Sequence, residues 1–347
     1  MHHHQPTNII ITQGVNSDER TPEAAAVVIT KAEEGQRNSC PSTVLTGNSS
    51  AFVSKINFVT PYLERIANVV TSVGREVKCP GYVVVGQCEN GHQFVKEIYC
   101  GREWCPVCGE DGSIAHNRRF SRWVTKAQEM RTMGYLVFTM PIVTRGNYRN
   151  KASLNELTKR VCNGDKSRRI KGLLKEMGFT RGLARWHWFG DTPGKWNPHL
   201  NVIIEAGRLT KLQLETIRLS WAGILGVDNA VVNYSYTAEI PKMVHILKYV
   251  TRATFREYNW DPFMAGALYN FRNMRYWGVW GWDPVWELES NDESNIEAIS
   301  ALESGNCPVC GTPVTWAKAR DIGWLDMWAS YGIAHRIGAG YWQLDTS

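Results

Sequence analysis

Two groups of cysteines, far apart in the sequence, constrain the fold of this chain more than any other feature. The segment "CGREWCPVC" carries Cys100, Cys105 and Cys108, and "NCPVCG" carries Cys307 and Cys310. A Cys-Pro-x-Cys-Gly turn directs backbone amides toward two thiolate sulfurs, an arrangement suited to a tetrahedral Zn²⁺ ion. The second pair has no partner pair near it in sequence, so its site needs ligands from the N-terminal side. The C-terminus is therefore predicted to fold back onto the cysteine-rich segment.

Several residues compete for the remaining zinc positions. For the first cysteine group we predict Cys88 as the fourth ligand, with His92 and Cys79 as competitors. For the second pair we expect ligands such as Cys79 and His92. Cys40 and Cys162 stand alone and are interpreted as ordinary thiols.

The start of the chain indicates where these cysteines reside. "MHHHQPTNII" lacks the charged and then apolar layout of a secretory signal, and no run approaches the ~18 apolar residues of a membrane span. We therefore expect a cytoplasmic protein with no membrane partner. Its nine cysteines are then expected to be metal ligands or buried thiols rather than disulfides.

The charge distribution points to a polyanionic partner. The net charge is +6, but residues 115–185 hold 17 Lys and Arg against 4 Asp and Glu. A segment with this excess of positive charge is suited to binding nucleic acid. Phosphate contacts are expected from Arg118, Arg119, Arg168 and Arg169. Residues 282–305 are acidic, contain no Lys or Arg, and are interpreted as a linker or a solvated helix.

Hydrophobic periodicity predicts an α+β fold with a central antiparallel sheet flanked by helices. Strands are expected at 134–143, 182–190, 198–207 and 229–237, and helices at 114–131, within 152–179, at 210–223 and at 240–255. The tryptophan-rich stretch 273–282 is interpreted as core, with base stacking as the alternative. With 43% hydrophobic residues, the chain of 347 residues has ample material for a core.

One polar pair stands out in the strand "PHLNVIIEAG". Side chains alternate along a strand, so His199 and Asn201 share a face. The turn-rich "DTPGKW" predicts a hairpin with the preceding strand, which brings His187 opposite 199–201 on that same face. Taken alone, this pattern also fits a half-exposed strand whose polar side meets water.

Three motifs in this order give the chain a family resemblance. "YLVFTMP", "NPHLNVII" and "HILKYVTRA" resemble the first motif, the metal-binding strand and the nucleophile helix of HUH endonucleases. "CGREWCPVC" is similar to the cysteine-rich segment that precedes the nickase core in one plasmid branch. The chain thus resembles a rolling-circle replication initiator of plasmids or phages across about residues 88 to 255.

The resemblance implies a mechanism and assigns roles. Tyr249 would attack a phosphate of single-stranded origin DNA, leaving a 5′-phosphotyrosine and a free 3′-OH that primes a polymerase. His199, Asn201 and His187 would hold Mg²⁺ or Mn²⁺. Lys248 or Arg252 would bind neighbouring phosphates, and His245 would serve as a base or a ligand. No phosphate-binding loop of a helicase is present, so a host helicase and polymerase are the expected partners.

Two departures from the family pattern leave alternatives open. Asn201 replaces the second histidine of the usual His-hydrophobic-His pair, and His245 stands where relatives often carry Glu or a second Tyr. A transposase or relaxase would share the chemistry, and a catalytically inactive zinc-containing DNA-binding regulator would explain Asn201. The expected organisation is a largely disordered segment 1–60, a zinc module 61–125, a nickase core 126–285, and an acidic linker with a Cys-pair and Trp-rich tail 286–347.

Overall fold

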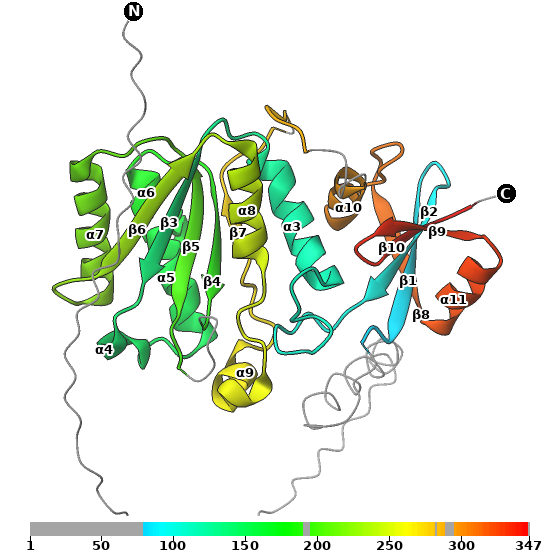
Figure 1. The fold of residues 1–347 in the computed structure, drawn as a ribbon, viewed down its shortest axis with the longest axis horizontal. Helices are drawn as coiled ribbons and strands as arrows, with labels where there is room; N and C mark the ends of the chain where they lie inside the picture. The colour runs from blue at the N-terminus through cyan, green and yellow to red at the C-terminus, as the bar shows by residue number, and fades with distance from the viewer. Residues whose placement is uncertain (1–78, 190–194, 282, 289–294, 346–347) are drawn as a thin grey trace, which may run out of the picture. The chain divides into compact units, whose positions relative to one another are not determined.

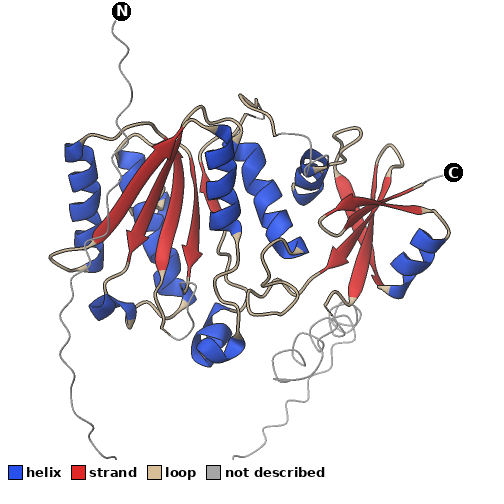
Figure 2. Cartoon of the chain, viewed as in Figure 1, coloured by secondary structure: helices blue, strands red, loops and turns tan. Residues whose placement is uncertain are grey.

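The computed structural model describes residues 79–189, 195–281, 283–288 and 295–345. The expectation of disorder over 1–60 lies outside these residues. The described chain is an α+β fold with two five-stranded antiparallel sheets and flanking helices (Figures 1 and 2). This confirms the predicted class.

We name the two sheets by the side chains that they carry. The cysteine sheet has the order β8–β1–β2–β10–β9, and the histidine sheet has the order β6–β3–β5–β4–β7. The strands of the cysteine sheet are β1 (Tyr82–Cys88), β2 (Gln93–Ile98), β8 (Val314–Asp321), β9 (Ala334–Gly338) and β10 (Tyr341–Leu344). Those of the histidine sheet are β3 (Met133–Thr139), β4 (Gly182–His187), β5 (His199–Glu205), β6 (Val231–Thr237) and β7 (Arg275–Trp277).

Four of the longer helices fall on the predicted helical segments: α3 (Ile114–Ala127), α5 (Lys151–Val161), α7 (Lys211–Leu225) and α8 (Ile240–Thr251). Two more form in the C-terminal part: α10 (Ile296–Glu303), where a linker or a solvated helix was expected, and α11 (Gly323–Ser330), which was not predicted. The shorter ones are α4 (Ile142–Arg145), α6 (Leu173–Glu176) and α9 (Pro262–Leu268). Residue preferences explain the ends: Thr210 and Gln213 form a capping box on α7, and Pro241 occupies the first turn of α8. No helix among the described residues has the length and apolar character to cross a membrane.

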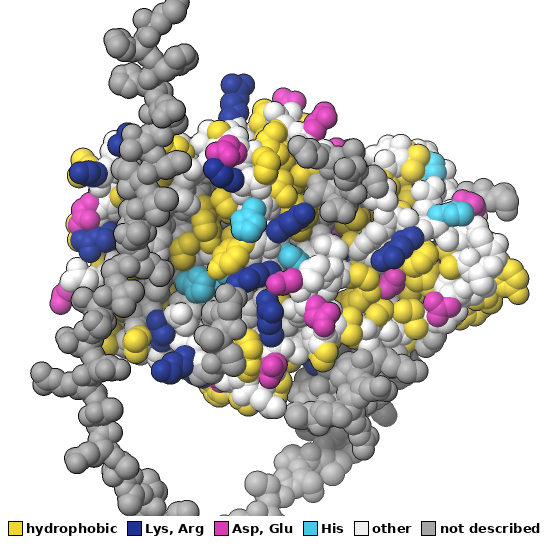
Figure 3. All heavy atoms as spheres, viewed as in Figure 1, with side chains coloured by type: hydrophobic (Ala, Val, Ile, Leu, Met, Phe, Trp, Pro, Cys, Tyr) yellow, Lys and Arg dark blue, Asp and Glu magenta, His cyan; other side chains and the backbone are white. Residues whose placement is uncertain are grey.

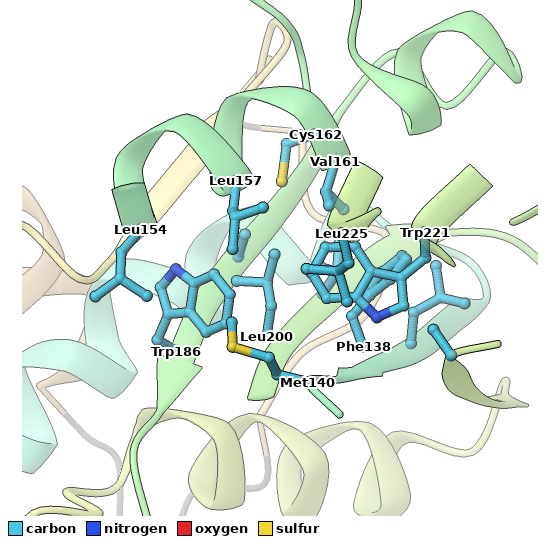
Figure 4. Close-up of a cluster of buried hydrophobic side chains, with 14 of the residues drawn as sticks. Phe138, Met140, Leu154, Leu157, Val161, Cys162, Trp186, Leu200, Trp221 and Leu225 are labelled. Carbon is cyan, nitrogen blue, oxygen red and sulfur yellow. The ribbon is translucent and has the colours of Figure 1, made fainter. Parts of the chain in front are cut away.

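The histidine sheet is buried on both faces by helices. On one face, Phe138, Trp186 and Leu200 pack against Leu157 of α5 and Trp221 of α7 (Figure 4). On the other face, α3 and α8 form a second core through apolar side chains at their inward positions. The sheet residues that meet these two helices include Leu183 and Ile203. Burial on both sides explains why β4 is continuously buried.

The cysteine sheet joins both ends of the described chain. Its centre is the hairpin of β1 and β2, which turns at Asn90-Gly91, a dipeptide that favours the positive φ of tight hairpins. The C-terminal strands β8 and β10 pair with the two sides of this hairpin. The predicted return of the C-terminus to the cysteine-rich segment is therefore confirmed.

The acidic segment differs from its prediction. A helix does form, but α10 is not solvated, because Ile299 and Leu302 are buried and α10 packs on α3. Its last residue, Glu303, lies 3.4 Å from Lys96 Nζ and 3.3 Å from Arg122 Nε. Attraction to the cations of α3 and β2 explains why this acidic helix is held against the molecule. The part of the segment at 289–294 is outside the described residues.

Candidate functional site

The cysteines assemble into two groups, each able to hold a metal ion. Group A contains Cys79, Cys100, Cys105 and Cys108, and group B contains Cys88, His92, Cys307 and Cys310. Within each group all ligand atoms lie within 4.8 Å of one another. The prediction of Cys88 as the fourth ligand of group A was wrong, since Cys79 fills that position and Cys88 belongs to group B. For group B the expected His92 is present, whereas Cys88 stands where Cys79 was expected.

The β1–β2 hairpin explains this division. Cys79 lies just before β1 and Cys100 just after β2, so both stand at the open end of the hairpin. Cys88 and His92 flank the turn at its closed end. Each end of the hairpin thus supplies two ligands, and one Cys-Pro-x-Cys turn closes each group. Seven residues of strand separate the two ends, too far for one ion to be shared.

The distances within the groups fit a tetrahedral metal. In group A, Cys108 Sγ lies 3.6 Å from both Cys79 Sγ and Cys100 Sγ. In group B, Cys88 Sγ lies 3.7 Å from Cys310 Sγ and 3.3 Å from His92 Nδ1. A disulfide requires about 2.05 Å, whereas two sulfurs on one Zn²⁺ stand about 3.8 Å apart. The observed separations match shared coordination and exclude a disulfide.

The surroundings of group B favour a thiolate. The Thr312 hydroxyl lies 3.1 Å from Cys310 Sγ, and hydrogen bonding from it lowers the pKa of Cys310 to about 5. At neutral pH this sulfur is ionised, which is the form that binds a cation.

The predicted face of the histidine sheet is confirmed by the register. His187 on β4 pairs directly with His199 on β5, and Arg185 pairs with Asn201. The two imidazole rings lie 5.4 Å apart between centroids. The half-exposed alternative does not hold, because His187 and Asn201 are buried and only His199 is partly exposed.

Backbone carbonyls fix the tautomers of both histidines. His187 Nε2 lies 2.9 Å from the Val250 carbonyl and His199 Nδ1 lies 3.1 Å from the Asn197 carbonyl. A carbonyl only accepts, so these two nitrogens carry the protons. The lone pairs are then on His187 Nδ1, which is buried with no hydrogen-bond partner in the described structure, and on His199 Nε2. Burial lowers the pKa of both imidazoles, which keeps them neutral.

Asn201 has a neighbour that the sequence did not suggest. The Tyr135 hydroxyl donates to Asn201 Oδ1 at 2.5 Å, and Asn201 Nδ2 donates to the Arg185 carbonyl at 3.4 Å. Burial raises the pKa of Tyr135, so its hydroxyl remains a donor. Asn201 is therefore oriented with its oxygen toward Tyr135. In the sequence, the only indication of this contact was that Tyr135, Val137 and Thr139 lie two residues apart on a predicted strand and so share one face of the sheet.

We expect Tyr135→Phe to lower the free energy of unfolding by about 1–3 kcal/mol, because it removes a donor from a buried carboxamide oxygen. Urea unfolding followed by fluorescence measures the change. Tyr276→Phe is the matched control, since Tyr276 is 53% exposed on β7. Equal stability of Tyr135→Phe and the control would mean that the hydrogen bond contributes nothing.

Tyr249 meets the histidines from α8. Its ring centroid lies 5.4 Å from that of His187, and the Arg252 guanidinium carbon lies 4.4 Å from the Tyr249 ring centroid. Tyr249 is 36% exposed, so part of its side chain can be reached from solvent. Figure 3 shows histidine and basic side chains gathered on this face of the molecule, around α8. Three separate segments thus place Tyr249, His187 and His199 together.

The other two residues assigned to this helix lie differently. His245 is exposed on α8, one turn before Tyr249. Lys248 Nζ lies over the Phe120 ring of α3, 5.6 Å from its centroid. Of the two cations proposed from sequence to bind neighbouring phosphates, Arg252 is therefore the nearer to Tyr249.

Glu103 connects group A with this site. It lies between Cys100 and Cys105, and its carboxylate is paired with the buried Arg185. The same carboxylate accepts the Thr254 amide at 3.0 Å, just beyond the end of α8. This pair could not be predicted from the sequence, because Glu103 and Arg185 are 82 residues apart and no spacing pattern links them.

No protein-family model matches this chain, and neither do any of the curated proteins or solved structures with which it was compared.

Proposed function

We propose that this chain nicks and rejoins single-stranded DNA through a covalent bond to Tyr249, as a rolling-circle replication initiator with an HUH core. The observation that carries the proposal is the contact of the Tyr249 ring with His187, which itself pairs with His199. A tyrosine beside two neutral imidazoles with oriented lone pairs is an unusual arrangement for a structural role. The excess of basic residues over 115–185 supports a polyanionic substrate.

The reaction is a transesterification. The Tyr249 oxygen forms a bond to phosphorus, its phenolic proton passes to solvent, and the bond from phosphorus to the 3′ oxygen breaks. Protonation of that oxygen gives a free 3′-OH, and the 5′ side stays on the protein as a phosphotyrosine. Rejoining is the reverse attack by a 3′-OH. Arg252 is placed to neutralise charge on the phosphate.

The donor atoms agree with a divalent ion at this site. His187 Nδ1 carries a buried lone pair with no hydrogen-bond partner among the described residues, and His199 Nε2 carries a second lone pair. Asn201 Oδ1 retains acceptor capacity beside its bond from Tyr135. Mg²⁺ or Mn²⁺ held there would supply Lewis-acid polarisation of the scissile phosphate. All three donors are neutral, so we expect a weaker affinity than that of a carboxylate site.

The direct test is incubation with a pool of single-stranded DNA and Mn²⁺, followed by sequencing of the attached DNA. We expect an adduct that survives denaturation, with a phosphotyrosyl peptide containing Tyr249. An adduct on a different tyrosine would reject the assigned nucleophile. The absence of any adduct would favour the DNA-binding regulator, for which the Asn at position 201 remains the strongest argument.

His199→Ala should lower the rate of adduct formation at least tenfold, because it removes one of the two free imidazole lone pairs. Binding of the same DNA should change little. Gel analysis of adduct against time, over a series of Mn²⁺ concentrations, measures the effect. Partial recovery at high Mn²⁺ would support lost metal affinity, and an unchanged rate would remove His199 from the site. His335→Ala is the control, since His335 is exposed on β9.

We also propose that Zn²⁺ occupies groups A and B, given their thiolate-rich ligands and tetrahedral spacing. A host helicase and polymerase remain the proposed partners, and origin DNA the proposed substrate.

A further inference from the structure

A second charged surface includes residues that contact the end of α8. It is a groove of about 830 Å³ lined by residues of β2, the group A loop, α3 and the segment 268–276. Nothing in the proposed chemistry uses it. Its walls carry four exposed or half-buried cations: Lys96, Arg122, Lys126 and Arg272.

The floor of the groove holds buried positive charge in excess. Arg119 and Arg185 are 7% and 2% exposed, and Glu103 is the carboxylate between them. Arg185 is paired with Glu103, whereas Arg119 donates from Nε to the Thr251 carbonyl and its Nη2 has no partner in the described structure. The other acidic lining residue, Glu303, is already paired with Lys96 and Arg122. The lining as a whole holds eight Lys and Arg against two Glu, so an anion that enters the groove meets a net positive charge.

Aromatic rings lie beside basic groups in the lining of the groove. Lys126 Nζ lies 4.9 Å from the Tyr276 ring centroid, and the Arg102 guanidinium carbon lies 4.9 Å from that of Tyr269. Tyr276 is 53% exposed although its neighbour Trp277 is buried in the core. Cations for the backbone beside exposed rings for the bases are the recurrent elements of surfaces that bind unpaired strands.

The groove is continuous with the residues that flank Tyr249. Arg185 on its floor pairs in register with Asn201 and donates to the Arg252 carbonyl at 3.2 Å. Arg119 contacts Thr251, two residues after Tyr249. A strand that passes the end of α8 can thus reach both surfaces.

We propose that this groove binds the unpaired DNA strand that flanks the nick. Phosphates contact Arg122 and Lys126, and a base stacks on Tyr276. The statement that this strand is the one that is nicked rests on the proposed function. The statement that the groove binds an unpaired strand is independent of the proposed function.

The test measures binding of fluorescent oligo-dT of about 30 nucleotides to the full chain over a series of salt concentrations. Arg122→Gln with Lys126→Gln should weaken binding about tenfold at moderate salt. It should also reduce the log–log salt slope by about 1.4, at about 0.7 per lost phosphate contact on a single strand. Arg208→Gln with Lys211→Gln is the matched control: it also removes two exposed charges, but at the start of α7, which packs on the opposite face of the histidine sheet. The control should change affinity less than twofold.

A second variant separates stacking from charge and from misfolding. Tyr276→Ala should weaken binding severalfold without a change in the salt slope. Because the Tyr276 side chain is exposed, its removal should leave the fold intact, so a loss of binding would not be due to unfolding. Equal losses in the two charge pairs, or no loss in the groove pair, would overturn the proposal. Tighter binding of a duplex of the same length would overturn the assignment to an unpaired strand.

The two proposals fail in different ways. If the groove is wrong and nicking is right, the wild-type chain forms the Tyr249 adduct while the groove variants bind DNA normally. If nicking is wrong and the groove is right, no adduct forms, yet the groove variants lose affinity for oligo-dT.

Discussion

Replacement of Tyr249 by Phe should abolish the covalent DNA adduct, a fall of about a thousandfold or more, while DNA affinity stays within about twofold of wild type. The change removes one hydroxyl and keeps the ring that packs on His187 and Arg252. The geometry of the site should therefore survive. Denaturing gels with labelled single-stranded DNA and Mn²⁺ measure the adduct, and fluorescence anisotropy measures binding.

Tyr331→Phe provides the control for this experiment. Tyr331 is 75% exposed and follows α11, on the cysteine-sheet side of the chain, so its hydroxyl can form a nonspecific adduct if any exposed tyrosine can. Its variant should react like wild type. A Tyr249→Phe protein that still forms a phosphotyrosyl bond would move the nucleophile elsewhere, with Tyr258 and Tyr234 the next to test. Tyr234 is the weaker candidate, because its hydroxyl donates to the Gly207 carbonyl.

The histidine sheet was predictable because its determinants are local. Strand alternation placed His199 and Asn201 on one face, and the hairpin turn placed His187 opposite, as the register confirms. Helical spacing likewise set α8 and the position of Tyr249 on it. What the sequence could not provide were contacts between distant segments, such as the hydrogen bond from Tyr135 to Asn201 and the ion pair of Glu103 with Arg185.

The zinc ligands also could be predicted only in part from the sequence. Cysteine spacing identified both Cys-Pro-x-Cys turns, but the partners of each turn depend on which end of a hairpin a residue occupies. Cys79 and Cys88 are both cysteines near β1, and only the pairing of β1 with β2 sends them to opposite ends. The Asn90-Gly91 turn was the signal that would have predicted that hairpin.

Metal analysis should find about two Zn²⁺ per chain, and the two sites should differ in their consequences. Cys105→Ser and Cys310→Ser should each remove about one equivalent. Cys162→Ala, which alters a buried thiol outside both groups, should remove none. Full folding of the wild-type chain in a strong chelator, with less than half an equivalent of zinc, would contradict both sites.

The difference between the sites follows from what each one holds. Group A fixes the loop from Cys100 to Cys108, and Glu103 in that loop holds Arg185 and the Thr254 amide behind α8. Loss of zinc from group A should therefore release the end of α8 and displace Tyr249. Group B instead ties the β1–β2 turn to the C-terminal Cys307–Cys310 turn.

Cys105→Ser should accordingly lower adduct formation at least tenfold, whereas Cys310→Ser should retain most of the activity at a temperature where both variants are folded. Adduct assays and thermal unfolding on the same preparations separate the two effects. Glu103→Gln gives an independent comparison, because it leaves all four ligands of group A but weakens the charged contact with Arg185. If Glu103→Gln retains its zinc but loses as much activity as Cys105→Ser, then group A acts on Tyr249 through the contacts of Glu103. If both cysteine variants lose activity in proportion to their loss of stability, the zinc sites act only by maintaining the fold.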